Sequence, residues 1–149
     1  MKPLFTILIA DRNPNVREFL KRELTTEGYR IRLARSAREV LFWAYSPDQL
    51  DLIVLDPDLP DDGGWGLLEK IEDRIPTLPV VLHMHASDYE QMGGRLRPAA
   101  FVEKQGSSVE NLKNVVKDIL TGSAKQRSRL SEENGTRFAE LDDEKRPGR

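Results

Sequence analysis

Apolar and polar residues alternate in blocks along most of the chain, and these blocks predict strands and helices in turn. Largely apolar runs over residues 4–10 and 50–55 end abruptly at an aspartate, as expected for strands buried on both faces of a parallel sheet. Residues 29–33 alternate apolar with charged side chains, which is typical of an edge strand. Two further strands are expected over residues 79–83 and 99–102.

Capping signals begin helices in the intervals between these strands. Asn13 followed by Pro14 predicts the start of a helix, and Gly28 predicts its end. The other helices are expected over residues 36–45, 65–75, 87–92 and 107–120. Five strands thus alternate with helices, which predicts an α/β fold with a five-stranded parallel sheet between two helical layers, a doubly wound (βα)5 three-layer sandwich.

Composition and charge indicate the domain organisation and exclude some classes of binding protein. The chain has 149 residues, of which 38% are hydrophobic and 32% charged, so we expect one compact domain and a segment outside its core. We assign residues 1–121 to the domain and the mostly polar residues 122–149 to a flexible tail. A formal net charge of −2 argues against nucleic-acid and membrane-surface binding. The absence of cysteine and of a membrane-spanning run favours a cytoplasmic protein.

Three residues with suitable chemistry follow the ends of predicted strands. Asp11 comes after the first strand, Asp56 after the third and Lys104 after the fifth. Because the carboxyl ends of parallel strands meet at one edge of the sheet, we expect these side chains to gather there. One carboxylate can act as a nucleophile toward phosphorus while another helps to hold Mg²⁺, and a lysine can pair with the transferred phosphoryl group.

Three segments, in the right order, resemble the response-regulator receivers of two-component signalling. ILIADRNP is similar to their first strand, DLIVLDPDLPDDGGWGLLEKI to their phosphoacceptor segment, and AAFVEKQGS to their fifth strand. In the second segment Pro60 follows Asp56 by four residues, as in that family. The resemblance covers residues 4–121 and implies the CheY-like, flavodoxin-like version of the predicted fold.

The resemblance also implies roles for individual residues. It makes Asp56 the phosphoacceptor and Asp11 a carboxylate of a Mg²⁺ site that Asp56 shares and to which Asp58 offers its backbone carbonyl. Lys104 would contact the phosphoryl group. Phe101 matches an aromatic position whose side-chain rotamer often reports activation, although a plain packing role fits it equally well.

Arg12 departs from the family pattern, because a second acid usually stands at this position. A guanidinium group is permanently charged and cannot bind a cation, so we expect Mg²⁺ binding to be weakened or lost. Three arrangements remain open for Arg12. It repels the metal, it pairs with Asp11 or Asp56 and takes over part of the metal's role, or it points into solvent.

Two further positions depart from the pattern. Counting from the start of the fourth strand, Met84 stands where the family has Thr or Ser, and a one-residue bulge would place His85 there instead. Methionine offers no useful hydrogen-bond donor, which weakens stabilisation of a phosphoryl group. Gly63 replaces an acid or amide. His83 and His85 alternate like two metal ligands, but ordinary hydrogen bonds are the favoured interpretation, since two histidines do not complete a site.

These features lead to one preferred function and two alternatives. We expect a stand-alone receiver, not an enzyme, that accepts a phosphoryl group on Asp56 from a histidine kinase or phosphotransfer protein and signals to an unidentified downstream protein, with a homodimer left open. Arg12, Met84 and Gly63 support instead a phosphorylation-independent interaction module. Asp56 and Asp58 also resemble the nucleophile motif of haloacid-dehalogenase-type phosphatases, which the location on the third strand disfavours.

Overall fold

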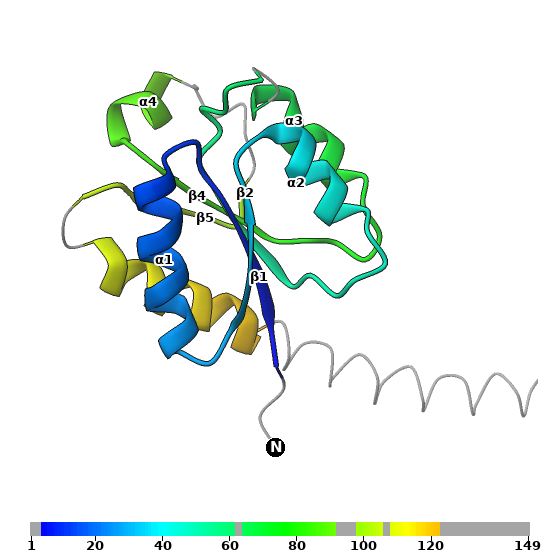
Figure 1. Ribbon diagram of the computed structural model, residues 1–149. Coiled ribbons are helices and arrows are strands. Elements are labelled where there is room, and N and C mark those ends of the chain that lie inside the picture. Colours follow the sequence, from blue (N-terminus) through cyan, green and yellow to red (C-terminus); the bar gives the residue numbers. More distant parts are fainter. Residues whose placement is uncertain (1–3, 62–63, 92–97, 106–107, 123–149) are drawn as a thin grey trace, which may run out of the picture.

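A computed structural model describes residues 4–61, 64–91, 98–105 and 108–122, and it contains the predicted parallel sheet (Figure 1). All strand pairs are parallel, and the strand order is β2-β1-β3-β4-β5. The strands are β1 (Thr6–Ala10), β2 (Arg30–Ala34), β3 (Leu52–Leu55), β4 (Val80–Met84) and β5 (Ala100–Glu103). The predicted fold class is therefore confirmed, and β2 lies at the edge of the sheet as its alternating pattern indicates.

The sheet is buried on both faces. Successive strand residues point to opposite sides, so each strand contributes to both hydrophobic clusters. In β1, Ile7 and Ile9 belong to one hydrophobic cluster, whereas Leu8 and Ala10 belong to the other. Figure 1 shows α2 (Ala37–Ala44) and α3 (Gly64–Glu72) on one side of the sheet. On the other side lie α1 (Pro14–Thr26) and a helix over residues 108–122, which we call the C-terminal helix. The helical layers thus leave the ends of the strands as the places where polar side chains can meet.

The helix boundaries follow from local chemistry. The Asn13 side chain accepts a hydrogen bond from the Asn15 amide at the start of α1, and Pro14 occupies the first helical position. After α1 ends, Gly28 takes a φ of +94°, a left-handed conformation that favours glycine. The Ser36 side chain caps α2 by accepting a hydrogen bond from the Glu39 amide.

The remaining helices differ from expectation mainly at their ends. The helix expected over residues 65–75 is α3 (Gly64–Glu72), which ends at Glu72, three residues before the expected end. The short helix α4 (Ala86–Gln91) corresponds to the one expected over residues 87–92. Ser107 and the whole segment over residues 123–149, including the predicted tail, lie outside the described residues. Within the described ranges, no helix is long and apolar enough to cross a membrane.

Candidate functional site

Lys104 joins two aspartates at the carboxyl ends of the strands. Its Nζ lies 2.6 Å from Oδ2 of Asp11 and 2.6 Å from Oδ2 of Asp56. Asp11 follows β1, Asp56 follows β3 and Lys104 follows β5, so the sheet brings together residues far apart in sequence. The side chains of the two aspartates are only 2% and 12% exposed. Sequence reasoning placed these three residues at one edge, and the structure brings them into direct contact.

The second oxygen of each carboxylate is held by a backbone amide. Asp11 Oδ1 accepts a hydrogen bond of 2.9 Å from the Asn13 amide, and Asp56 Oδ1 accepts one of 2.9 Å from the Asp58 amide. Both are local turns of the kind that aspartate forms with the amide two residues later. The carboxylates therefore have fixed orientations, with their Oδ2 atoms turned toward Lys104.

The lysine between these aspartates is firmly protonated. Burial alone would lower the pKa of Lys104, but hydrogen bonds and charge attraction from Asp11 and Asp56 outweigh burial and hold that pKa above its ordinary value. Protonation suits the short contacts observed, because the ammonium group attracts both carboxylates and can donate to each of them. The site thus contains two buried anions and one buried cation.

Arg12 takes an arrangement that the sequence analysis did not include. Its Nε donates a hydrogen bond of 3.0 Å to the Asp58 carbonyl oxygen, and its Nη2 lies 3.3 Å from Asp58 Oδ1. Of the three arrangements that the sequence leaves open, pairing with Asp11 or Asp56 is therefore not the one observed. The physical reason is that Lys104 and backbone amides already satisfy those two carboxylates, whereas Asp58 offers a carbonyl and a carboxylate together to the planar guanidinium.

These contacts do not fit a Mg²⁺ ion. The Asp58 carbonyl that would bind the metal accepts from Arg12, and the carboxylates of Asp11 and Asp56 are bridged by Lys104. Mg²⁺ requires several oxygen ligands in near-octahedral geometry. Across the described parts of the chain, no cluster of three or more His, Cys, Asp or Glu side chains could hold a metal ion. The oxygens that would bind the metal thus already contact cationic side chains and backbone amides of the protein.

Comparison with known proteins agrees with this geometry. Residues 7–117 match the response regulator receiver domain. The chain belongs to this family. Among curated relatives, the DNA-binding transcriptional regulator NtrC of Bradyrhizobium sp. (strain RP501 Parasponia) is 34% identical over 80 residues, which make up 54% of this receiver chain and 16% of NtrC. The chain therefore matches only a small part of that relative's length.

Solved structures extend the comparison to the whole receiver fold. The response regulator TrrA from Thermotoga maritima, in complex with Mg²⁺-BeF, is 31% identical with a TM-score of 0.71, covering 78% of this chain and 100% of TrrA. A structure of the histidine kinase ThkA in complex with TrrA matches with 30% identity and a TM-score of 0.66, covering 78% of this chain and 99% of the matched one. Receivers similar to this one therefore include a protein bound to Mg²⁺-BeF and a protein bound to a kinase.

The last residue of β4 is Met84, at the position where the receiver family usually has Thr or Ser. The β4 register against β5 runs without interruption through Met84, so the bulge that would bring in His85 is not formed. Met84 is buried in the hydrophobic core, and its carbonyl accepts a hydrogen bond of 2.9 Å from the Lys104 amide. Methionine therefore occupies this position of the receiver. Gly63, the other substituted position, lies outside the described residues.

The two histidines at this end do not form a pair. His83 is buried, whereas His85 is exposed. The His83 Nε2 lies 3.5 Å from Ser108 Oγ, and its Nδ1 has no hydrogen-bond partner among the described residues. Burial, assisted by the charge of Lys104, lowers the pKa of His83 to about 4. His83 is therefore neutral at physiological pH.

Phe101 packs against α4. Its ring stacks on that of Tyr89 with the ring centroids 4.1 Å apart and an angle of 11° between the planes. Both rings are partly buried against the hydrophobic cluster beneath α2 and α3. This stacking joins β5 to α4 at a point three residues before Lys104. Phe101 therefore has a packing role and also lies on the strand that leads to Lys104.

Two residues of this end were missed by sequence reasoning. Asp61 accepts hydrogen bonds of 2.9 and 3.0 Å from the amides of Ala37 and Arg38, which begin α2. These bonds hold the pKa of the Asp61 carboxyl below its ordinary value. Arg17 donates a hydrogen bond of 2.6 Å to the carbonyl oxygen of Asp11. The Asp61 contact spans 24 residues, so no local pattern predicts it. Arg17 lies only six residues after Asp11, and this short spacing could have indicated its contact.

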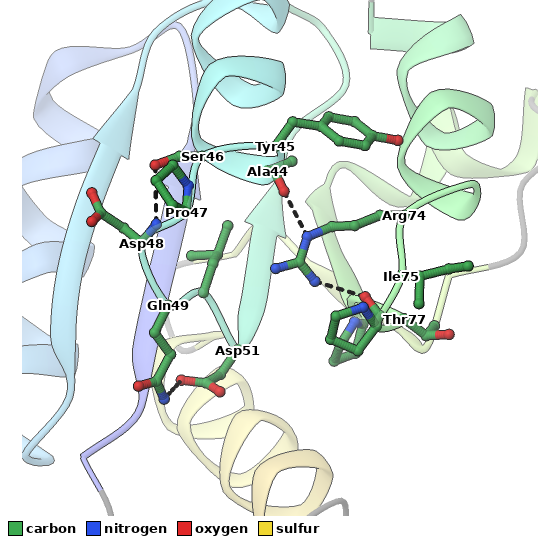
Figure 2. Close-up of a pocket in the computed structure, with 13 residues that line it drawn as sticks. Ala44, Tyr45, Ser46, Pro47, Asp48, Gln49, Asp51, Arg74, Ile75 and Thr77 are labelled. Atoms are coloured by element: carbon green, nitrogen blue, oxygen red, sulfur yellow. Dashed lines mark hydrogen bonds between the residues drawn. The ribbon is translucent and has the colours of Figure 1, made fainter.

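A separate cavity of about 860 Å³ lies away from the aspartates, between the end of α2 and the segment before β4 (Figure 2). Arg74 extends into it and donates hydrogen bonds to the carbonyl oxygens of Ala44, at 2.6 Å, and Pro76, at 2.7 Å. Gln49 donates to Asp51 at the lower edge of the view. The charged groups of Arg74 and Asp51 thus bind backbone groups and a close neighbour, which is typical of a structural role.

Proposed function

We propose that this receiver accepts a phosphoryl group on Asp56 from a histidine kinase or phosphotransfer protein and passes the change to a downstream protein. The observation that carries this proposal is the contact of Lys104 with both Asp56 and Asp11 at 2.6 Å. A carboxylate beside a protonated lysine at a strand end can bind a phosphoryl group covalently and have its charge offset at once.

The transfer is an in-line displacement at phosphorus. An Asp56 carboxylate oxygen forms the new P–O bond as the P–N bond to the donor histidine breaks, and the bond electrons return to the imidazole ring. The acyl phosphate adds negative charge close to Lys104, whose contact with Asp56 then changes from carboxylate to phosphoryl oxygen. The raised pKa of Lys104 means that its charge is available at neutral pH.

The output follows from the connection between Lys104 and β5. Phe101 lies on the same strand and stacks on Tyr89 of α4. A shift of Lys104 toward a phosphoryl group would change the strain on β5 and with it this stacked pair. We therefore propose the surface of α4, β5 and the C-terminal helix as the surface that binds the downstream protein, with Phe101 as the reporting residue.

A phosphorylation assay tests this function. The purified protein is incubated with acetyl phosphate and analysed by intact mass, and we expect the mass gain of one phosphoryl group. Asp56→Asn should abolish this gain. Asp51→Asn is the matched control, because Asp51 is also buried and lies just before the same strand, away from Lys104. No gain in the wild type, or an equal gain in Asp56→Asn, contradicts the proposal.

A second candidate function is a phosphorylation-independent interaction module. The contact of Arg12 with Asp58 supports it, because the guanidinium already ties together the loops after β1 and β3. Met84 supports it as well, since it places no hydroxyl at the end of β4. In that case acetyl phosphate and beryllofluoride should leave the melting temperature unchanged at every Mg²⁺ concentration.

A further inference from the structure

The oxygens that a divalent cation would need are bound to donors of the protein itself. Lys104 occupies Oδ2 of both Asp11 and Asp56, and the Asn13 and Asp58 amides occupy their Oδ1 atoms. The Asp58 carbonyl accepts from Arg12. A metal ion would have to displace several of these donors and then lie in the same pocket as the positive charges of Lys104 and Arg12, which like-charge repulsion opposes.

The arginine nevertheless lies where a cation is useful. Its guanidinium is anchored on Asp58, the residue whose amide donates a hydrogen bond to the Asp56 carboxylate, so a permanent positive charge is held in the same turn as that carboxylate. The anchoring contacts use Nε and Nη2, and within the described residues Nη1 makes no polar contact. A guanidinium group has five N–H donors and binds tetrahedral oxyanions through two of them at once.

The contact between Arg12 and Asp58 is also exchangeable. The two side chains are 50% and 75% exposed, so water screens their attraction and an anion can compete for the guanidinium. Lys104, by contrast, is enclosed between its aspartates. An anion on Asp56 would thus meet one buried cation and one that can turn toward it.

We propose that Arg12 is a built-in cation that replaces the divalent metal, so that a phosphoryl group, or a fluoride complex of the same shape, binds at Asp56 between Arg12 and Lys104 without Mg²⁺. This inference rests on the proposed phosphoacceptor role of Asp56 and adds how the charge of the group is neutralised. It also explains why the residue type that cannot bind a metal stands at this position.

Beryllofluoride binding tests the proposal. The ligand is titrated into the full chain in buffer freed of divalent metal over a chelating resin, and again with added Mg²⁺, with melting temperature and nuclear magnetic resonance shifts as readouts. For the wild type we expect dissociation constants that agree within about twofold in the two buffers. For Arg12→Gln we expect at least about tenfold weaker binding in the metal-free buffer, which corresponds to one lost charge-assisted contact.

Arg12→Asp supplies the opposite arm of the test. It restores a second acid, so binding should now require Mg²⁺ and be at least about tenfold tighter with the metal than without it. Arg22→Asp is the matched control, because it makes the same charge change on the exposed surface of α1 and should behave like the wild type. Unliganded melting curves establish that each variant is folded, and Arg12→Gln alone decides the question if Arg12→Asp does not fold.

Each remaining outcome has a distinct meaning. Wild-type binding that depends on Mg²⁺ overturns the role of Arg12 and leaves Asp56 as acceptor. Binding by Arg12→Asp but not by the wild type overturns it too, because Arg12 then blocks the pocket and the phosphorylation-independent function is favoured. Absence of binding in every protein and buffer contradicts both the role of Arg12 and the proposed function.

Discussion

Two lysines of this receiver are almost equally buried but lie in different electrostatic surroundings. The side chains of Lys104 and Lys113 are 16% and 14% exposed. Lys104 contacts two carboxylates at 2.6 Å, and both of these carboxylates are themselves buried. Lys113 contacts three carboxylates at 3.4 to 3.6 Å, and the side chains of those residues are 26 to 77% exposed. The three partners of Lys113 are Glu23, Glu27 and Glu110.

The difference lies in the partners and not in the lysines. Exposed carboxylates keep most of their hydration and contribute little when paired. Buried carboxylates depend on their counter-ion, because removing it leaves charge in a poorly solvated place. Lys113 therefore links the C-terminal helix to α1 by ion pairs, whereas Lys104 neutralises the charges of the two aspartates of the site.

The largest expected effect is that of removing Lys104. Lys104→Met leaves Asp11 and Asp56 facing each other without a cation, and we expect the free energy of unfolding to fall by about 3 kcal/mol at pH 7. Lys113→Met, an identical change at similar exposure of the lysine, should have a much smaller effect because its partners are more exposed than Asp11 and Asp56. Urea unfolding at pH 7 measures both. Equal losses in the two variants would break the comparison.

Adding Asp11→Asn to Lys104→Met sharpens this result. The amide removes one of the two facing charges, so the double variant should recover more than about 1 kcal/mol of the loss, as expected for residues that interact directly. No recovery would mean that Lys104 stabilises the protein through packing of its alkyl chain rather than through charge.

Next in size is a pH effect from His83, which lies under the influence of Lys104. Its pKa of about 4 in the folded state lies below the value of about 6.5 expected when unfolded, so the unfolded chain binds an extra proton between these values. Stability is therefore full above pH 6.5 and falls as the pH drops toward 4. The linkage relation gives a loss of about 2 kcal/mol between pH 7.5 and pH 5.

Two histidine variants isolate this effect in urea unfolding across that pH range. His83→Gln should flatten the pH dependence, whatever its effect at pH 7.5. His85→Gln, which replaces the exposed histidine two residues along the chain, is the matched control. A steep slope that survives in His83→Gln would assign the acid sensitivity to other groups.

The fold was predictable because its signals are local and agree with one another. Apolar runs, Asn13 with Pro14, and Gly28 each specify a boundary from a few neighbouring residues. The convergence of Asp11, Asp56 and Lys104 was also predictable, since the topology alone brings the ends of parallel strands together.

The contacts of individual side chains were less predictable. The placement of Arg12 depends on which acceptors Lys104 and the amides leave available, and that competition is decided only in the folded chain. The bonds from Asp61 to the start of α2 depend on how two loops approach in space. Sequence reasoning thus brought Asp11, Asp56 and Lys104 to one edge of the sheet, but it left the partner of Arg12 open and did not include Asp58 among the candidates.

Asp61 provides a carboxylate that is bound to backbone amides instead of to a lysine. Asp61→Ala removes two acceptors from the first turn of α2, and loss of a helix cap of this kind costs about 1 kcal/mol. Urea unfolding at pH 7 measures the change, and Asp73→Ala, an exposed aspartate beyond the end of α3, is the control. Equal effects of the two variants would show that Asp61 does not cap α2.

The smallest effect distinguishes the two lysines by salt. At about 1 M NaCl the screening length falls to about 3 Å, which is shorter than the contacts of Lys113 with its glutamates. The loss caused by Lys113→Met should therefore vanish within error at high salt. Most of the loss caused by Lys104→Met should remain, because ions do not enter between buried partners 2.6 Å apart. If both losses vanished, the aspartates beside Lys104 would be as open to solvent as the glutamates beside Lys113, and their burial could not be what sets the two regions apart.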